Sequence, residues 1–333
     1  MTADVTPTQA SSGERAPGGP ISAEGFAPDP TRDWLRMLGG VAFAVGALIL
    51  FVRKSGGLGD GTEWAEFPLL LVLLVPCVAL YGVGVAGRAS GEPLQPWQSV
   101  LLVAGVLLVP LVLLQFVDTI GGSTGDSLNV AWIFAVTAAL AAYASLNLGA
   151  AYQALLAALA VLIAWLSFWD KVLDDPSVNT FRWLLIVIGA GFLAGAIALR
   201  RQEARQAREL ITAAGIAAVL VGLLGAAEVL AELIGGLFAP DVGGGGGGQS
   251  VVWDVFLLAA SLALVGYGAR VGARGPAYVG TFGLLVFVLI IGAEVGALAD
   301  LEDREGKLVG WPLILLLGGA AALVAGLRPG STR

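Results

Sequence analysis

Residues 67–86 read FPLLLVLLVPCVALYGVGVA, and none of these 20 residues is charged. An α-helix rises about 1.5 Å per residue, so a helix of this length covers about 30 Å, the thickness of the hydrocarbon core of a bilayer. This stretch therefore predicts a transmembrane helix.

Stretches of the same kind recur along the chain. Hydrophobic residues make up 57% of the 333 residues, charged residues only 13%, and the mean hydropathy is +0.85. Soluble globular domains of this length are much more polar. We therefore expect an all-α fold, a polytopic α-helical integral membrane protein with about ten transmembrane helices. The apolar stretches cover residues 34–52, 67–86, 97–117, 130–147, 150–169, 181–199, 211–238, 252–269, 276–299 and 311–327.

Two connections need separate interpretation. Between the fourth and fifth stretches the sequence is apolar throughout, interrupted only by Ser145, Asn147 and Gly149. We expect a tight helical turn there, because a single helix of that length would overrun the bilayer. After the sixth stretch comes an arginine-rich segment, 200–208, which we expect to continue the sixth helix and to rest on anionic headgroups.

Small residues recur within the apolar stretches. Pairs of glycines at i and i+4 allow helix backbones to approach closely, and in lipid this close packing replaces the hydrophobic drive between helices. We expect such pairs to pack against other helices of the same chain. The pairs are Gly191 with Gly195, Gly268 with Gly272, and Gly292 with Gly296.

Both ends of the chain differ from the transmembrane domain, which we assign to residues 31–328. Residues 1–30 are rich in Pro, Gly and Ser, so we expect a disordered cytoplasmic tail. Because no short apolar segment with a small-residue cleavage site precedes the first stretch, we expect that stretch to be retained. A second short cytoplasmic tail is expected at residues 329–333.

The distribution of basic residues predicts the orientation. With the N-terminus in the cytoplasm, the inner segments hold 12 basic residues and the outer loops 6. Short basic loops resist translocation, so this asymmetry favours both termini in the cytoplasm, although Arg53 and Lys54 in the first outer loop oppose it. Arginine outnumbers lysine and Ala, Gly, Val and Leu dominate, as in a GC-rich bacterial gene. We therefore expect a bacterial cytoplasmic membrane.

Missing residue types exclude several classes of chemistry. The chain has no histidine and a single cysteine, Cys77, which lies within the second apolar stretch. We therefore expect no metal site, no cofactor and no Cys/His catalysis, and we do not expect an enzyme. No phosphate-binding G-x-x-x-x-G-K-[ST] loop occurs. The net charge of −7 argues against nucleic-acid binding.

Acids within apolar stretches are the most specific candidates for function. Glu228 and Glu232 lie one helical turn apart in the seventh stretch, and Glu294 lies in the ninth. Carboxylates near the bilayer interior are costly, and they commonly mark an ion pathway or a buried partner. We expect these three acids to bind a proton or a cation. The alternative is that these acids lie at the outer membrane interface, or form hydrogen bonds with neighbouring helices, and bind no ion.

Gln115 and Asp118 add polar candidates along the third stretch. Together with the acids, they favour an ion-coupled secondary transporter or permease, whose partners would be the lipid bilayer and a small solute or cation. The alternative is a membrane protein that transports nothing, such as a scaffold, an accessory subunit or a sensor. The sequence does not decide between these classes.

Overall fold

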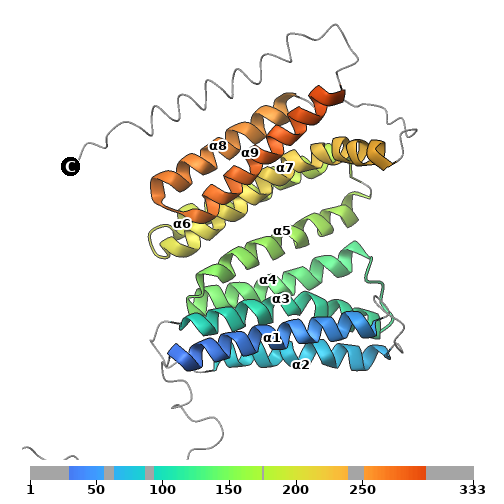
Figure 1. Ribbon diagram of the computed structural model, residues 1–333, viewed down its shortest axis with the longest axis vertical. Coiled ribbons are helices and arrows are strands. Elements are labelled where there is room, and N and C mark those ends of the chain that lie inside the picture. The colour runs from blue at the N-terminus through green and yellow to red at the C-terminus, as the bar shows by residue number, and fades with distance from the viewer. Residues whose placement is uncertain (1–29, 56–63, 87–93, 175, 239–250, 298–333) are drawn as a thin grey trace, which may run out of the picture. The chain divides into compact units, whose positions relative to one another are not determined.

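A computed structural model describes the backbone of residues 30–55, 64–86, 94–174, 176–238 and 251–297. Within these ranges it describes all side chains except those of residues 30, 31, 225–238, 251, 289 and 291–297. The described residues form helices and turns, without strands (Figure 1). The helices are α1 (Pro30–Lys54), α2 (Glu66–Val85), α3 (Pro96–Thr119), α4 (Ser127–Leu148), α5 (Ala151–Leu173), α6 (Val178–Leu199), α7 (Ala204–Phe238), α8 (Val251–Val271) and α9 (Arg274–Ala297).

The expectation of an all-helical membrane protein is confirmed. Eight of the described helices, α1 to α8, are long and apolar enough to cross a bilayer, as judged by length and composition. The expected count of about ten is not confirmed. In α9 the apolar part with described side chains, Arg274–Val288, is shorter, and the tenth predicted stretch, 311–327, lies outside the described residues. The predicted tails lie outside them as well, apart from Pro30 in α1.

Helix ends are set by local chemistry that hydropathy alone does not report. At the start of α3, Gln95 and Gln98 form a capping box, in which the Gln95 N–H donates to Oε1 of Gln98 at 2.9 Å. At the start of α6, the hydroxyl of Ser177 accepts the N–H of Thr180. Such caps satisfy backbone groups that have no partner within the helix.

The predicted turn between the fourth and fifth stretches is confirmed. Helix α4 ends at Leu148, and Gly149 has a φ of +72°, a left-handed conformation that glycine adopts without strain. The N–H of Gly149 bonds back to the carbonyl of Ser145 at 3.1 Å, as in the usual helix end with a left-handed glycine. The chain therefore reverses within two residues.

The predicted continuation of the sixth helix through residues 200–208 was wrong, and contact of this segment with anionic headgroups stays a prediction. Helix α6 ends at Leu199, and the N–H groups of Gln202 and Glu203 both donate to the Leu199 carbonyl, at 3.1 and 2.8 Å. These bonds close a turn, and a new helix begins at Ala204. A chain that must re-enter the membrane needs such a reversal, whereas a continued helix would carry it away from the bilayer. The arginines of this segment are thus divided between a turn and the first turns of α7.

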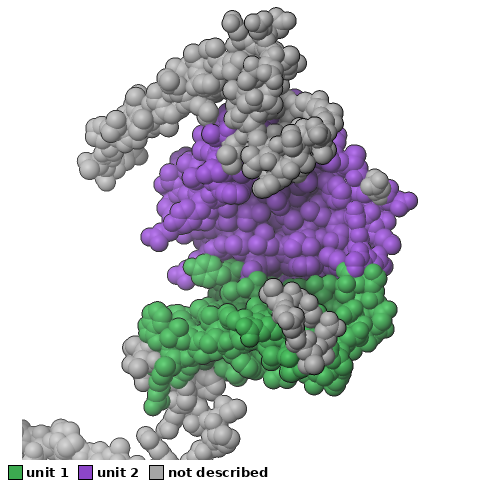
Figure 2. All heavy atoms as spheres, turned by 45° about the vertical axis from the view of Figure 1, so that its right-hand side comes forward, with its two compact units in different colours: residues 1–124, 140–153 green, residues 125–139, 154–333 purple. Residues whose placement is uncertain are grey.

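The described chain divides into two compact units, coloured separately in Figure 2. Unit 1 comprises residues 1–124 and 140–153 and contains α1, α2 and α3, which all contact one another. The Tyr81 hydroxyl of α2 donates to the Leu140 carbonyl at 3.2 Å. The core of unit 1 includes Ala44, Leu73, Cys77, Leu80, Trp97, Leu101 and Leu108.

Unit 2 comprises residues 125–139 and 154–333 and contains α6, α7, α8 and α9. Helix α7 contacts the other three, and α8 also packs along α9. The indole N–H of Trp165 in α5 donates to the Leu184 carbonyl of α6 at 3.2 Å. Two clusters form the core of unit 2, one around Leu185, Ala213, Ala217 and Val221, the other around Leu257, Val286, Phe287 and Ile290.

Close contacts between helices are made by glycines both outside and within the predicted i, i+4 pairs. A Cβ on Gly105 of α3 would lie 3.0 Å from the Tyr81 nitrogen of α2, and one on Gly280 of α9 would lie 2.7 Å from the Ser261 carbonyl of α8. Of the predicted pairs, Gly268 lies tightly against Ala277, whereas nothing lies within 4 Å of a Cβ on Gly191 or Gly272. Gly292 and Gly296 lie outside the described side chains.

We expect Gly280→Ala and Gly266→Ala to have opposite effects on stability. The added methyl at Gly280 meets the backbone of α8, including the Val265 nitrogen at 2.8 Å, whereas nothing lies within 4 Å of a Cβ on Gly266. Overpacking costs about 1–3 kcal/mol, while replacing an unhindered helical glycine by alanine contributes up to about 1 kcal/mol. Thermal midpoints in detergent should therefore fall for Gly280→Ala and rise for Gly266→Ala. A rise for both variants would contradict the α8–α9 contact.

Ion pairing joins the adjacent ends of α4 and α5. Nζ of Lys171 lies 3.0 Å from Oδ1 of Asp126, and the Ser127 hydroxyl donates to the Asp170 carboxylate. The hydrogen bond from Lys171, assisted by the backbone N–H of Leu128, lowers the pKa of Asp126 below its ordinary value. The pair therefore stabilises the fold above the ordinary aspartate pKa of about 3.9, and this contribution disappears as the pH falls through the lowered pKa.

We expect Lys171→Met to lower the thermal midpoint slightly at neutral pH and to have no effect in acid, where Asp126 is protonated. The effect is small, because exposed ion pairs are weak. Midpoints of the wild type and the variant measured from pH 7 down to pH 2 test this. In an Asp126→Asn background, the same substitution should change nothing at any pH.

Candidate functional site

The three acids predicted to bind an ion occur in helices whose side chains are only partly described. Positions 228 and 232 fall in α7 and position 294 in α9, but the side chains of Glu228, Glu232 and Glu294 lie outside the described residues. Ion binding by these acids therefore stays a prediction.

The other two predicted residues, Gln115 and Asp118, lie together at an open cavity of about 640 Å³. We call it the α1–α2–α3 cavity, because it lies in unit 1 where α1 and α3 end and α2 begins. Helix ends are where backbone and charged side chains reach the edge of a membrane domain, so polar groups of several helices converge there. The polar lining residues used below are Lys54, Trp64, Glu66, Gln115 and Asp118.

Lys54 provides the positive charge of the cavity. The N–H of Trp64 donates to the Lys54 carbonyl at 3.1 Å, which holds the end of α1 beside the start of α2. The Lys54 ammonium lies 5.7 Å from the centre of the Trp64 ring, within the range of a cation–π contact. Lys54 is thereby positioned without a carboxylate partner among the described residues.

Two acids provide the negative charge. Glu66 lies in the first turn of α2, where the positive end of the helix dipole favours an acid, and Asp118 lies in the last turn of α3. Both side chains are exposed, and in the described part of the chain neither forms an ion pair with Lys54. The α1–α2–α3 cavity therefore presents charges of both signs that are not neutralised by each other in contact pairs.

Gln115 is the buried polar group of the cavity. Its side chain is only 7% exposed, and its amide nitrogen has no hydrogen-bond partner among the described residues. The backbone carbonyl of Gln115 accepts a hydrogen bond from the Thr119 hydroxyl at 2.7 Å, so the group without a partner is in the side chain of Gln115. A buried donor without a partner costs about 1–3 kcal/mol. A solute or water oxygen in the cavity would remove this penalty.

Sequence reasoning did not group Lys54, Trp64 and Glu66 with the site. They belong to the first loop and its flanks, and only the packing of α1 and α2 against α3 brings them to Gln115. It also did not single out Gln153, which is fully buried in α5 and whose amide atoms lack hydrogen-bond partners among the described residues. Gln153 could have been identified in the same way as Gln115, because each is a polar residue within an apolar stretch.

No group of three or more His, Cys, Asp or Glu side chains that could hold a metal ion occurs in the part of the chain whose side chains are described. The α1–α2–α3 cavity presents charged and hydrogen-bonding side chains. In comparisons with known proteins, no family model, no curated sequence and no solved structure significantly matches this chain.

We expect Gln115→Met to stabilise the protein in the absence of solute, by about 1 kcal/mol, because it removes an unpaired buried amide and keeps the side-chain volume. Gln98→Met is the matched control in the same helix. Gln98 is equally buried, but its amide accepts the capping hydrogen bond from the Gln95 N–H, so its loss should destabilise. Thermal midpoints in detergent test both variants. Equal destabilisation by both would show that the Gln115 amide is paired.

Proposed function

We propose that the protein is a secondary transporter or permease for a small polar solute and that the α1–α2–α3 cavity binds this solute. The observation that carries the proposal is the buried Gln115 amide, which lacks a partner among the described residues and lines a cavity with charges of both signs. The cavity volume of about 640 Å³ lies within the range of small-molecule sites.

The charges of the cavity favour a zwitterionic solute. An ammonium group of the solute would lie near Glu66 and Asp118, and its carboxylate near Lys54. The Gln115 amide nitrogen would donate to a carboxylate oxygen, because a hydrogen bond to a charged acceptor is stronger than one to a neutral acceptor. An apolar solute would leave all these groups unpaired, so it would bind poorly.

Glu228, Glu232 and Glu294 are the groups that we propose for the coupling ion. Without a phosphate-binding loop on this chain, energy would come from an ion gradient. In a bacterial cytoplasmic membrane with both termini inside, which is the orientation favoured by the arginine distribution, α1 would end at the outer face. The α1–α2–α3 cavity would then open to the outside and receive the solute there.

The alternative is a sensor or accessory subunit that binds the same solute without moving it. Exposed charges at a helix-end cavity would support binding in either case. The two functions differ in flux alone, so they require a transport measurement in addition to a binding measurement.

We expect zwitterionic amino acids or betaines to raise the thermal midpoint of the purified protein, because a ligand that binds only the native state stabilises it by about 2.7 kcal/mol at 100 times its Kd. Asp118→Asn should weaken this binding about tenfold, which is the loss of one charge-assisted contact. Asp174→Asn is the control, with the same loss of charge at an exposed position that does not line the cavity. Asp174 has a left-handed φ of 47°, which asparagine tolerates.

Flux into proteoliposomes then separates the two functions. Uptake that depends on an imposed proton or sodium gradient supports the transporter, and stabilisation without uptake supports the sensor or accessory subunit. If no zwitterion or other small polar solute stabilises the protein, the α1–α2–α3 cavity is not a solute site.

A further inference from the structure

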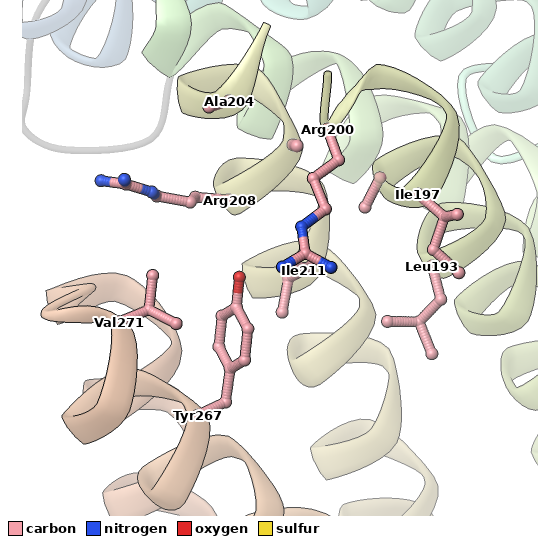
Figure 3. A pocket seen from close by; sticks show the side chains of 10 residues that line it. Leu193, Ile197, Arg200, Ala204, Arg208, Ile211, Tyr267 and Val271 are labelled. Atoms are coloured by element: carbon pink, nitrogen blue, oxygen red, sulfur yellow. The ribbon is translucent and has the colours of Figure 1, made fainter. Parts of the chain in front are cut away.

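A second cavity, of about 430 Å³, lies within unit 2 where α6 ends, α7 begins and α8 ends (Figure 3). We call it the α6–α7–α8 pocket. It exists because the chain reverses at residues 200–203, which places the first turns of α7 beside the last turns of α6. No part of the α1–α2–α3 cavity contributes to it.

One end of the pocket is cationic. Arg200 follows the last residue of α6, and Arg208 lies on the second turn of α7. In Figure 3 the guanidinium of Arg200 and the hydroxyl of Tyr267 lie toward each other, while the Arg208 side chain extends away from both, so a change of rotamer would bring its guanidinium to a ligand held by the other two. This arrangement gives two permanent positive charges and one neutral hydroxyl donor.

These charges have no acidic partner within the described residues. Glu203 and Glu209 are the acids nearest in sequence, and neither forms an ion pair with Arg200 or Arg208. Guanidinium groups left without a carboxylate attract an external anion, and phosphate matches their planar donor geometry.

The rest of the pocket is apolar. Seven of its ten lining residues are Ala, Leu, Ile or Val. Three large side chains among these are exposed on the surface, namely Leu193 at 46%, Ile197 at 75% and Val271 at 39%. In a membrane-spanning unit such side chains face lipid tails. The pocket therefore joins an anion-attracting end directly to an apolar surface.

We propose that the α6–α7–α8 pocket binds one anionic phospholipid. Arg200 and Arg208 would contact the phosphate, the Tyr267 hydroxyl would donate to a phosphate oxygen, and an acyl chain would lie over Leu193, Ile197 and Val271. A free phosphate would use only the cationic end and leave the apolar lining unused. The positive-inside distribution places this end at the cytoplasmic face, where basic pockets between helices hold anionic headgroups.

The inference is independent of solute transport. A phospholipid seated there would connect the turn between α6 and α7 with the end of α8. It would therefore stabilise unit 2 whatever the α1–α2–α3 cavity binds. Failure of one proposal leaves the other unchanged, because the two cavities share no residue.

The test uses the full chain in nanodiscs of phosphatidylcholine, with and without phosphatidylglycerol. We expect phosphatidylglycerol to raise the thermal midpoint, and native mass spectrometry of the detergent-solubilised protein to retain one phosphatidylglycerol molecule. Arg200→Gln with Arg208→Gln should weaken this binding by tenfold or more, since loss of one charge-assisted contact corresponds to about tenfold. Tyr267→Phe should weaken it less.

The matched control is Arg201→Gln with Arg205→Gln, which removes the same charge from the same segment but from positions that do not line the pocket. This control should keep the bound lipid. Equal loss in both double variants would show general attraction to anionic headgroups and overturn the proposal. It would also be overturned if phosphatidylglycerol had no effect, or if inorganic phosphate stabilised the detergent-solubilised protein as strongly as the lipid did. Unchanged midpoints of all variants in pure phosphatidylcholine establish that they fold.

Discussion

The constraint on which this structure depends is that a backbone within lipid must satisfy its own hydrogen bonds. A helix does so along its length and fails only in its first and last turns, where N–H and C=O groups lack partners. Polar groups of the protein therefore gather at helix ends. Both cavities follow this rule, since one lies where α1 and α3 end and α2 begins, and the other where α6 and α8 end and α7 begins.

The same solvent determines how the helices hold together within each unit. Lipid tails are as apolar as leucine, so close packing of small residues replaces hydrophobic attraction between helices. Gly280 against Ser261 and Gly268 against Ala277 are the closest such contacts to the backbone of a facing helix, followed by Gly105 against Tyr81. The spacing of glycines within one helix identified Gly268 but not Gly280 or Gly105, because close packing also requires the facing helix to present its backbone at the same height. The height at which two helices face each other depends on how they pack, and the sequence of one helix does not specify it.

Hydropathy was sufficient to locate α1 to α8, since the requirement of about 20 apolar residues per crossing acts on each stretch separately. Gly149 could also be placed, because a block too long for one helix needs a reversal and glycine accepts the left-handed conformation there. The end of α6 at Leu199 could not, since basic residues are compatible with either a helix or a turn. Gln115 and Asp118 were recognised as polar residues in an apolar stretch, but their neighbours Lys54 and Glu66 come from other helices.

The two cavities differ in the signs of their charges, and this difference is the reason for proposing a different ligand for each. Lys54 opposes Glu66 and Asp118 without pairing with them, so a zwitterion would place a group of opposite charge beside the lysine and beside the two acids, and the cavity would keep one net negative charge. Arg200 and Arg208 form no ion pair with an acid among the described residues, so an external anion would compensate them. The exposure of the lining side chains further restricts the kind of ligand proposed for each cavity. Gln115 is buried, so its amide would form a hydrogen bond with a small polar molecule that enters the α1–α2–α3 cavity. Ile197 and Leu193 are exposed, so they would form apolar contacts with an acyl chain that continues into the bilayer.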